Sequence, residues 1–476
     1  MTVLAIDQGT SGTKAIVHDG ESILAVVEVP VRPHYRSGGL VEIDAHTLLD
    51  SVLESGRRAV AEAGNPPIDM VSLANQGESV LAWDQESGQP LSQTIIWQDK
   101  RAQPICDELF ESSAAISATT GLVLDPYFSA PKMTWLRRNQ TKDGVVTTTD
   151  SWLVHQLTGE FVTDATTASR SLVFGLDSGE WDADMLRLFR LDDEALPRIV
   201  RNDEVVGTTS AFGGSIPVGG LIVDQQAALL AQNCLSAGDL KCTFGTGAFL
   251  LGNVGQAPLR SAHGLSTSVA WSFADGQSYC LDGQSLTMGS AVRWMVAAGL
   301  LSAPDALDAE CGESTNGAVF VPGLAGFAAP RWETDARGAF VGLSLETEKH
   351  HLIRAVVEGL AAQVTELVHC LERDAGTPIR RLNVDGGATR SRALMQAQAD
   401  LLQIPIDCFP SAHATVLGTA AAARLSLDPG RALGEVVTSW TPSMSYEPRW
   451  QPDRADEVRS AWDQAVLATT SLGRKR

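Results

Sequence analysis

The chain has few basic residues, since 36 Lys and Arg stand against 57 Asp and Glu and give a formal net charge of −21. Nucleic acids and anionic membrane surfaces bind basic patches, so we expect neither as a partner. The acidic balance is still compatible with a local phosphate site, because backbone N–H groups can build one.

Cysteines are also few, and the seven present are scattered with no CxxC pair. An odd number of separated cysteines in a long chain argues against a disulfide framework or a zinc knuckle. No apolar run reaches about 18 residues, the length needed to span a membrane. Residues 1–10 enter a strand pattern directly, without the features of a signal peptide. We therefore expect a reduced, cytoplasmic location and no membrane association.

What is present is the pattern of an α/β protein. The length of 476 residues allows two or three domains, and the 44% of hydrophobic residues is ordinary for a globular chain. Short apolar runs of strand length alternate with helical periodicity, which is clear in residues 48–60 and strongest in residues 352–371. This alternation predicts an α/β fold throughout.

One local plan occurs twice. The strand-like run 3–7 leads into a turn rich in Gly and Thr, and residues 240–244 lead into a similar turn. Thr10 and Thr246, one in each turn, are 236 residues apart, about half the chain. The repeat predicts two similar halves that each open with a hairpin.

Such turns are suited to phosphate, because glycines allow close backbone approach while successive N–H groups and Thr hydroxyls supply donors. Neither turn is a Walker A loop, and no GxGxxG follows the first strand. Taken alone, either turn could be an ordinary hairpin turn with no phosphate-binding role. Asp7 before the first turn and the second copy at half-length favour two hairpins that grip a nucleotide from both sides.

Six groups of residues resemble, in order, the FGGY family of carbohydrate kinases and within it the glycerol kinase branch: 5–15, 75–84 with 95–101, 127–139, 224–229 with 243–249, 338–358 and 385–402. The resemblance extends from residue 4 to about residue 427. It implies an α/β fold of the actin-like, ribonuclease-H-like type, with two similar domains around a central cleft. We expect residues 1–230 to carry the acceptor site and the first hairpin, and residues 231–476 the second hairpin and the adenosine site.

The resemblance also implies a function. The chain would be a transferase, an ATP-dependent kinase that moves the γ-phosphoryl group to a terminal hydroxyl of a small polyol or sugar, and a homodimer. Asp224 is implied as the base that takes the hydroxyl proton; from the residues alone, an Asp between a strand and an apolar helix is equally an N-cap. Asp7 is implied to hold Mg²⁺ through water, with Asp224 as the second carboxylate near the metal.

The remaining site residues follow from the same matching positions. Hydroxyl groups need carboxylates and amides as partners, and a carbon chain needs an apolar wall. The implied acceptor positions are Gly77, Glu78, Trp97, Tyr127, Asp224, Gln225 and Phe249. The implied nucleotide positions are Thr10, Ser11, Gly12, Lys14, Thr246, Gly289, Arg293, Gly387 and Ser391. Without the resemblance, Trp97 and Tyr127 are equally well explained as core aromatics.

The chain departs from its branch at one acceptor position. Glycerol kinases have Asn-Gln-Arg-Glu where residues 75–78 here read Asn-Gln-Gly-Glu. Gly77 therefore lacks a fork of donors, and we expect empty volume beside it and a longer acceptor of four or five carbons. Alternatively, an arginine from elsewhere in the chain could supply the missing donors. Lys14, Arg293 and Ser391 also differ from the branch, but ATP binding is expected to survive because backbone contacts carry most of it.

Two other functions compete. A ketose kinase of the same family, acting for example on xylulose, usually shows Gln-Met-His-Gly at the acceptor strand and lacks the DQQAAL form found at residues 224–229. A non-catalytic actin-like ATP switch needs no carboxylate facing a polyol, so the joint presence of Asp7, Glu78 and Asp224 argues against it.

Overall fold

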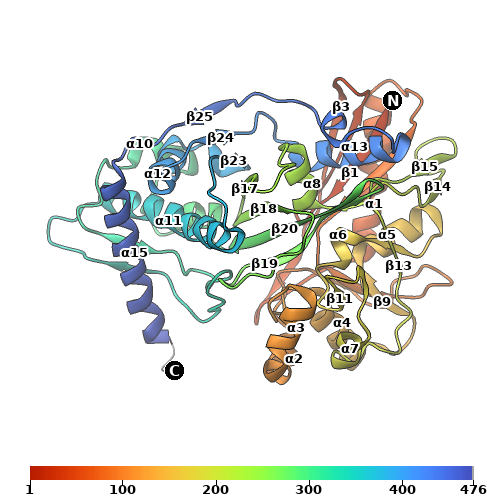
Figure 1. The fold of residues 1–476 in the computed structure, drawn as a ribbon, viewed down its shortest axis with the longest axis horizontal. Helices are drawn as coiled ribbons and strands as arrows, with labels where there is room; N and C mark the ends of the chain where they lie inside the picture. Colours follow the sequence, from red (N-terminus) through yellow and green to blue (C-terminus); the bar gives the residue numbers. More distant parts are fainter. Residues whose placement is uncertain (474–476) are drawn as a thin grey trace.

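The computed structural model describes residues 1–473, with side chains up to residue 470. Its two lobes lie side by side, and the red to yellow half of the chain forms one of them (Figure 1). Most of the later half forms the other, with helix α15 (Pro452–Gly473) along its outer side. Across the described residues, no helix is both long enough and apolar enough to cross a membrane.

The N-terminal lobe is built on a seven-stranded sheet in the order β14-β15-β6-β1-β2-β3, with β16 also paired to β6. Strands β1 and β2 form the first hairpin, and β6 lies parallel to β1 on its other side. The strands are β1 (Val3–Gln8), β2 (Gly12–His18), β3 (Ile23–Pro30), β6 (Met70–Asn75), β14 (Gly207–Thr209), β15 (Ile216–Val218) and β16 (Ile222–Val223).

The C-terminal lobe repeats this plan in a sheet of order β19-β20-β18-β17-β23-β24-β25. Strands β17 and β18 form the second hairpin, and β23 lies parallel to β17 as β6 does to β1. The duplicated hairpin read from the sequence is therefore present, and the fold is actin-like. The strands are β17 (Leu240–Phe244), β18 (Ala248–Gly255), β19 (Ser266–Phe273), β20 (Gly276–Ser285), β23 (Leu382–Asp385), β24 (Ile406–Cys408) and β25 (Met444–Tyr446).

Burial explains why the central strands are continuous apolar runs rather than alternating ones. Every residue of β6 is buried, and Val3 to Ile6 of β1 are fully buried, because helices cover both faces of the sheet. Helix α1 (Ala45–Glu62) covers one face, and its N-cap is Asp44, whose side chain accepts the Thr47 N–H. Helix α11 (Lys349–Ala375) is the long apolar helix expected from the sequence, and it packs on α12 (Arg392–Leu402).

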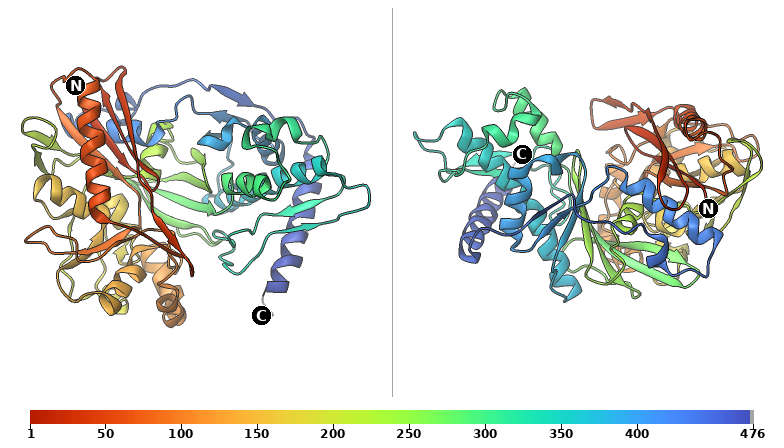
Figure 2. Two further views of the ribbon diagram at one scale, coloured as in Figure 1. Left: turned by 180° about the vertical axis from the view of Figure 1, so that it is seen from behind. Right: turned by 90° about the horizontal axis from the view of Figure 1, so that it is seen from above.

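One helix of the late sequence returns to the first lobe. Helix α13 (Ala414–Leu427), drawn in blue beside the red strands in Figures 1 and 2, packs on β1, β6 and α8 (Asp224–Ala231). Its Val416 and Ala420 share a buried cluster with Val3 and Ala5 of β1. Because α8 begins at Asp224, this contact helps to position the start of α8 at the cleft.

The smaller elements complete the two lobes. A five-stranded sheet in the N-terminal lobe has the order β4 (His34–Arg36), β5 (Leu40–Ile43), β8 (Thr94–Ile95), β7 (Val80–Trp83) and β9 (Val145–Thr148). The further helices of the N-terminal lobe are α2 (Gln103–Glu108), α3 (Ser113–Thr120), α4 (Ser129–Asn139), α5 (Thr149–Thr158), α6 (Ala165–Ala168) and α7 (Ala183–Leu188). Short pairs join β10 (Val162–Asp164) to β13 (Arg198–Val200), β11 (Phe174–Gly175) to β12 (Glu180–Trp181), and β21 (Val319–Val321) to β22 (Ala339–Val341). The C-terminal lobe adds α9 (Gly289–Ala297), α10 (Leu307–Glu310) and α14 (Leu433–Val436).

Candidate active site

A cavity of about 850 Å³ lies between the lobes, and both hairpins line it. Every acceptor position expected from the sequence contributes to its wall, as do four of the nucleotide positions: Thr10, Ser11, Thr246 and Arg293. A second cavity of about 460 Å³ is lined by Asp7, Lys14 and Gly387, and by residues that sequence reasoning missed, including Thr243, Asp385, Arg390 and His413.

Three expected nucleotide residues line neither cavity. Gly12 lies in β2, where an added Cβ would approach the Val29 carbonyl at 3.2 Å. Gly289 begins α9, and its N–H donates to the Gly245 carbonyl of the second hairpin at 3.0 Å. Ser391 is the N-cap of α12 and also donates to Asp308. In the structure Gly12 and Gly289 therefore contribute to the two hairpins, and Ser391 caps a helix.

Asp224 occupies the first helical position of α8, directly after β16. The N-cap of this helix is Val223, so the N-cap alternative for Asp224 does not hold. The carboxylate accepts the Gln225 N–H at 2.6 Å. Burial raises the pKa of Asp224, while the charge of Lys241 and the bond from Gln225 act in the opposite direction. A carboxylate with a raised pKa in a cleft has the properties of a general base.

Lys241 is a functional candidate that sequence reasoning missed. It is fully buried in β17, and its Nζ donates to Gln225 Oε1 at 2.6 Å and to Thr243 Oγ1 at 2.9 Å. Thr243 in turn donates to Asp385 at 2.6 Å. Burial lowers the pKa of Lys241, and the charges of Asp385 and Asp224 oppose that change. A lysine inside the apolar strand run 240–244 was the signal available in the sequence.

Asp7 is the penultimate residue of β1, just before the turn of the first hairpin. Burial, reinforced by the charge of Asp224, raises its pKa to about 7. Within residues 1–473 no hydrogen bond or ion pair is made by its carboxylate, and Lys14 approaches Glu28 at 3.8 Å instead. The described residues also contain no group of three or more His, Cys, Asp or Glu that could hold a metal ion by themselves. A half-buried carboxylate that makes no hydrogen bond or ion pair with the described residues fits a cation that brings its own water and phosphate ligands.

Three aromatic side chains form the apolar wall of the cavity. The ring of Trp97 meets Tyr127 edge-on at 5.6 Å between centroids, and Phe249 in the same way at 5.8 Å. The Trp97 indole N–H donates to Thr10 Oγ1 at 2.9 Å. Trp97 therefore joins the first hairpin to the acceptor wall, and neither Trp97 nor Tyr127 is a plain core residue.

Lys132, a second residue that sequence reasoning missed, holds the Tyr127 segment in place. Its Nζ is buried and donates to three successive carbonyls, those of Pro126 at 2.8 Å, Tyr127 at 2.5 Å and Phe128 at 2.6 Å. Burial lowers the pKa of Lys132 to about 8. The lysine stands inside the family signature 127–139, which was its only signal in the sequence.

The expectation of empty volume beside Gly77 is wrong. A Cβ added to Gly77 would lie 2.8 Å from Val223 Cγ2 and 3.7 Å from Arg170 Cδ. Val223 and Arg170 therefore fill the space that a larger residue would take. Arg170 also donates to Glu78, so an arginine from elsewhere does reach this part of the site.

This fold and site define a two-domain kinase that phosphorylates an alcohol group. The N-terminal domain of the FGGY family of carbohydrate kinases matches residues 2–231, and the C-terminal domain of that family matches residues 240–427. The chain belongs to the FGGY family of carbohydrate kinases, and it is an ATP-dependent transferase.

Individual relatives agree with this assignment. The glycerol kinase of Alkalilimnicola ehrlichii is 38% identical over 98% of this chain and 97% of its own length, and glycerol kinase 2 of Thermotoga maritima is 36% identical over 99% of both. Among solved structures, Plasmodium falciparum glycerol kinase with ADP is 29% identical with a TM-score of 0.91, covering 98% of each chain. Lactobacillus acidophilus gluconate kinase, 21% identical with a TM-score of 0.90 over 100% of this chain and 98% of its own, shows the fold alone.

Proposed function

We propose that the chain transfers the γ-phosphoryl group of ATP to a terminal hydroxyl of glycerol. The observation that carries the proposal is the gathering of Asp224, Glu78 and Tyr127 in one cavity that both hairpins line. The curated relatives named glycerol kinase support this acceptor. The main argument for a longer acceptor was empty volume beside Gly77, and Val223 fills that volume.

In this proposal Asp224 accepts the proton of the attacking hydroxyl while the new O–P bond forms and the bond from the γ-phosphorus to ADP breaks. Glu78 and Gln225 hold the other hydroxyl groups, and the aromatic wall covers the carbon chain. Backbone N–H groups and hydroxyls of Thr10, Ser11 and Thr246 face the phosphate chain from the two hairpins.

Mg²⁺ fits the unpaired carboxylate of Asp7, which would hold it through water, with Asp224 nearby. The ion supplies neutralisation of phosphate charge when bound. A cation there would also favour the charged form of Asp7, whose pKa burial raises to about 7.

For the nucleotide base and ribose, the proposed region lies around Gly387, Arg293 and α12. The adjacent Gly386 has φ +96°, and a Cβ there would lie 2.5 Å from the Phe244 carbonyl of the second hairpin. Only glycine allows this close approach of two backbones, which places the Gly387 turn directly against the hairpin.

Three further points are part of the proposal. We divide the chain into domains 1–230 and 231–476, with the boundary at the end of α8. We place the protein in the cytoplasm, a location compatible with seven free cysteines. We also expect a homodimer and no nucleic-acid partner, the latter because of the net charge of −21.

The acceptor is tested by coupled ADP release with ATP and Mg²⁺ against glycerol, erythritol, threitol, the pentitols, ribulose and xylulose. The Asp224→Ala variant supplies the blank. We expect glycerol to give the highest kcat/KM. A higher value for a longer polyol or a ketose would replace glycerol as the acceptor, and no turnover of any compound would revive the non-catalytic ATP switch.

The variant Lys241→Met should change the pH dependence of the reaction. The charge of Lys241 lowers the pKa of Asp224, so its removal raises that pKa. Asp224 must be deprotonated to act as a base, so activity is present above its pKa and is lost as the pH falls through it. We therefore expect the acid limb of kcat/KM for glycerol to move to higher pH.

A pH–rate profile of Lys241→Met against the unmodified chain makes this measurement. Lys100→Met is the matched control, because Lys100 lines the same cavity but its charge acts on Asp125. An acid limb that stays in place in Lys241→Met, or moves equally in both variants, would contradict the assignment of Asp224 as the titrating base.

A further inference from the structure

A single buried guanidinium joins the acceptor site to the opposite lobe. Arg170 follows α6 in the N-terminal lobe, and only 6% of it is exposed. Its Nε donates to Glu78 Oε1, and its Nη1 donates to Asp282 Oδ2. Asp282 lies on β20 of the C-terminal lobe, so one side chain connects a carboxylate of the cavity wall to the other half of the molecule.

The carboxylate that Arg170 holds sits on a strained backbone. Glu78 has φ +61°, in the left-handed region that non-glycine residues rarely adopt. Such a conformation persists only where the surroundings determine it, and it occurs preferentially at functional sites. Here the Ser79 N–H donates to the Gly77 carbonyl at 2.8 Å, and the Arg170 pair fixes the direction of the side chain.

Arg170 also lies against Tyr127, another residue of the cavity wall. The Arg170 Cζ lies 5.8 Å from the centre of the Tyr127 ring, and Nη2 lies 3.5 Å from its hydroxyl. At that distance the contact is weak, so Nη2 has donor capacity left on the side of the tyrosine. The guanidinium therefore contacts two acceptor positions at once.

Gly77 and Val223 leave room for this arrangement. The nearest atom to a Cβ at Gly77 is Val223 Cγ2 at 2.8 Å, and the next two belong to Arg170, at 3.7 and 3.8 Å. Gly77 has no positive φ, so an alanine there meets a packing conflict and no backbone strain. The pair is matched in size, since a larger residue at 77 needs a smaller one at 223.

We propose that Arg170 is the positioning residue of the acceptor site. It aims the Glu78 carboxylate at the hydroxyl groups of the acceptor and ties that carboxylate to Asp282, while Gly77 and Val223 keep its place open. The inference rests on the proposed function. The competing account is an ion pair that only holds the two lobes together.

The variants Arg170→Gln and Arg170→Lys separate these accounts, with glycerol as the acceptor. We expect Arg170→Gln to raise KM for glycerol at least 10-fold while KM for ATP changes less than 2-fold. Arg170→Lys should recover part of the loss, because a lysine can still pair with Glu78. A thermal shift with ADP shows that the nucleotide site is still folded in each variant.

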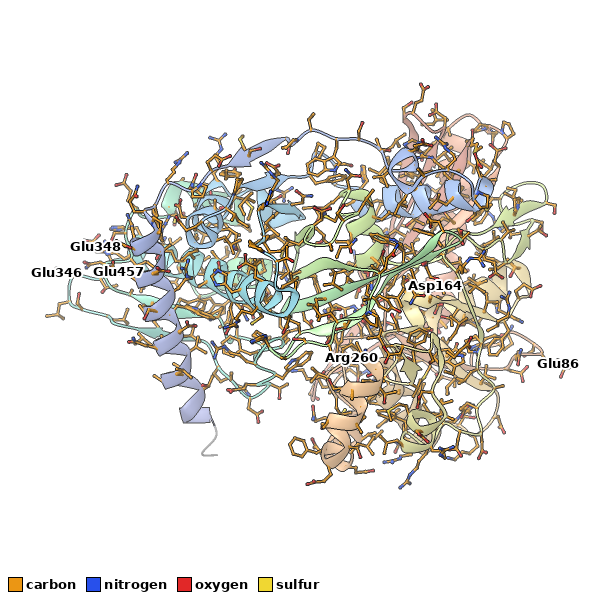
Figure 3. All side chains as sticks on the ribbon, viewed as in Figure 1. Glu86, Asp164, Arg260, Glu346, Glu348 and Glu457 are labelled. Carbon is orange, nitrogen blue, oxygen red and sulfur yellow. The ribbon has the colours of Figure 1, made fainter. Side chains whose placement is uncertain are left out.

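Arg260→Gln is the matched control. Arg260, labelled in Figure 3, lies where the lobes meet and pairs with Asp177 at 2.6 Å across them. It also donates to the Ala118 carbonyl of α3 at 2.9 Å. A residue that only bridges the lobes should behave like Arg260, so we expect this variant to leave both KM values unchanged.

A size-matched cycle provides the second test. Gly77→Ala alone should raise KM for glycerol, because the new methyl group would lie 2.8 Å from Val223 Cγ2 and displaces Val223, which packs in the same space as Arg170. In the double variant Gly77→Ala/Val223→Ala the space is restored, and we expect KM to return to within about 3-fold of the unmodified chain, well short of the additive result.

The outcomes are distinct. If the unmodified chain turns over an acceptor of the panel but Arg170→Gln changes neither KM, or changes both equally, the positioning role is overturned and the proposed function stands. If Arg170→Gln does not fold, the KM values of Arg170→Lys and of the Gly77 and Val223 variants test the positioning role instead. Additive effects of the Gly77 and Val223 changes on KM would also overturn that role. If no acceptor is turned over, the proposed function and this inference fall together.

Discussion

Replacing Asp224 by Asn should lower kcat for glycerol by about 10²–10⁴-fold, the range that a positioned general base contributes. The amide has the same shape, and its oxygen can still accept the Gln225 N–H that now bonds the carboxylate at 2.6 Å. It has no lone pair basic enough to take the hydroxyl proton. The loss should therefore fall on kcat, while ADP still binds.

The measurement is kcat from coupled ADP release, together with a thermal shift on addition of ADP. Asp275→Asn is the control, because Asp275 is exposed on the turn between β19 and β20 and does not line either cavity. If Asp224→Asn kept more than a tenth of the activity, the base would have to be another group. Glu78, whose pKa is also raised by burial, would then be the first candidate.

The second large effect is on stability. Gly418→Ala places a methyl group where α13 meets α8, and the new Cβ would lie 1.8 Å from the Ala227 carbonyl oxygen and 2.6 Å from the carbonyl carbon. Both atoms belong to a helix backbone, so α13 has to move away from α8. Overpacking of this kind costs about 1–3 kcal/mol or more.

We expect the variant to melt several degrees below the unmodified chain and to lose kcat/KM, because α8 begins at Asp224. Differential scanning calorimetry and the kinase assay make the two measurements. Gly434→Ala adds the same methyl group where the nearest atom, Leu235 Cδ1, is 4.0 Å away, and it should melt like the unmodified chain. Equal melting of both variants would show that the helix contact is looser than the structure has it.

The parts of the fold that were predictable are those encoded over short distances. Residues 3–18 carry two strands and the turn between them in one segment, and residues 240–252 do the same. A hairpin needs only apolar strand runs and a turn that glycine permits, so both copies could be read from local chemistry. Each hairpin also pairs with a third, parallel strand, which is β6 in the first lobe and β23 in the second. These strands come from far along the chain, and their pairing with the hairpins was not predicted.

The site divides in the same way. Trp97, Tyr127 and Asp224, which line one cavity, could be singled out from the sequence because each stands in a recognisable segment of its own. Arg170 was missed because its partners are 92 and 112 residues away, so no stretch of sequence shows them together. The volume beside Gly77 was misjudged for a related reason, since the side chain that fills it belongs to Val223.

By itself, the sequence determined an α/β chain with two similar halves, a family resemblance, and a set of polar residues suited to phosphoryl transfer. Only the tertiary structure decided which charges pair, that Lys241 lies beneath Gln225, and that Val223 and Arg170 close the space at Gly77. The physical reason is that motifs and periodicity are properties of neighbouring residues, whereas packing volume and buried ion pairs depend on residues that meet only when the sheets and helices have assembled.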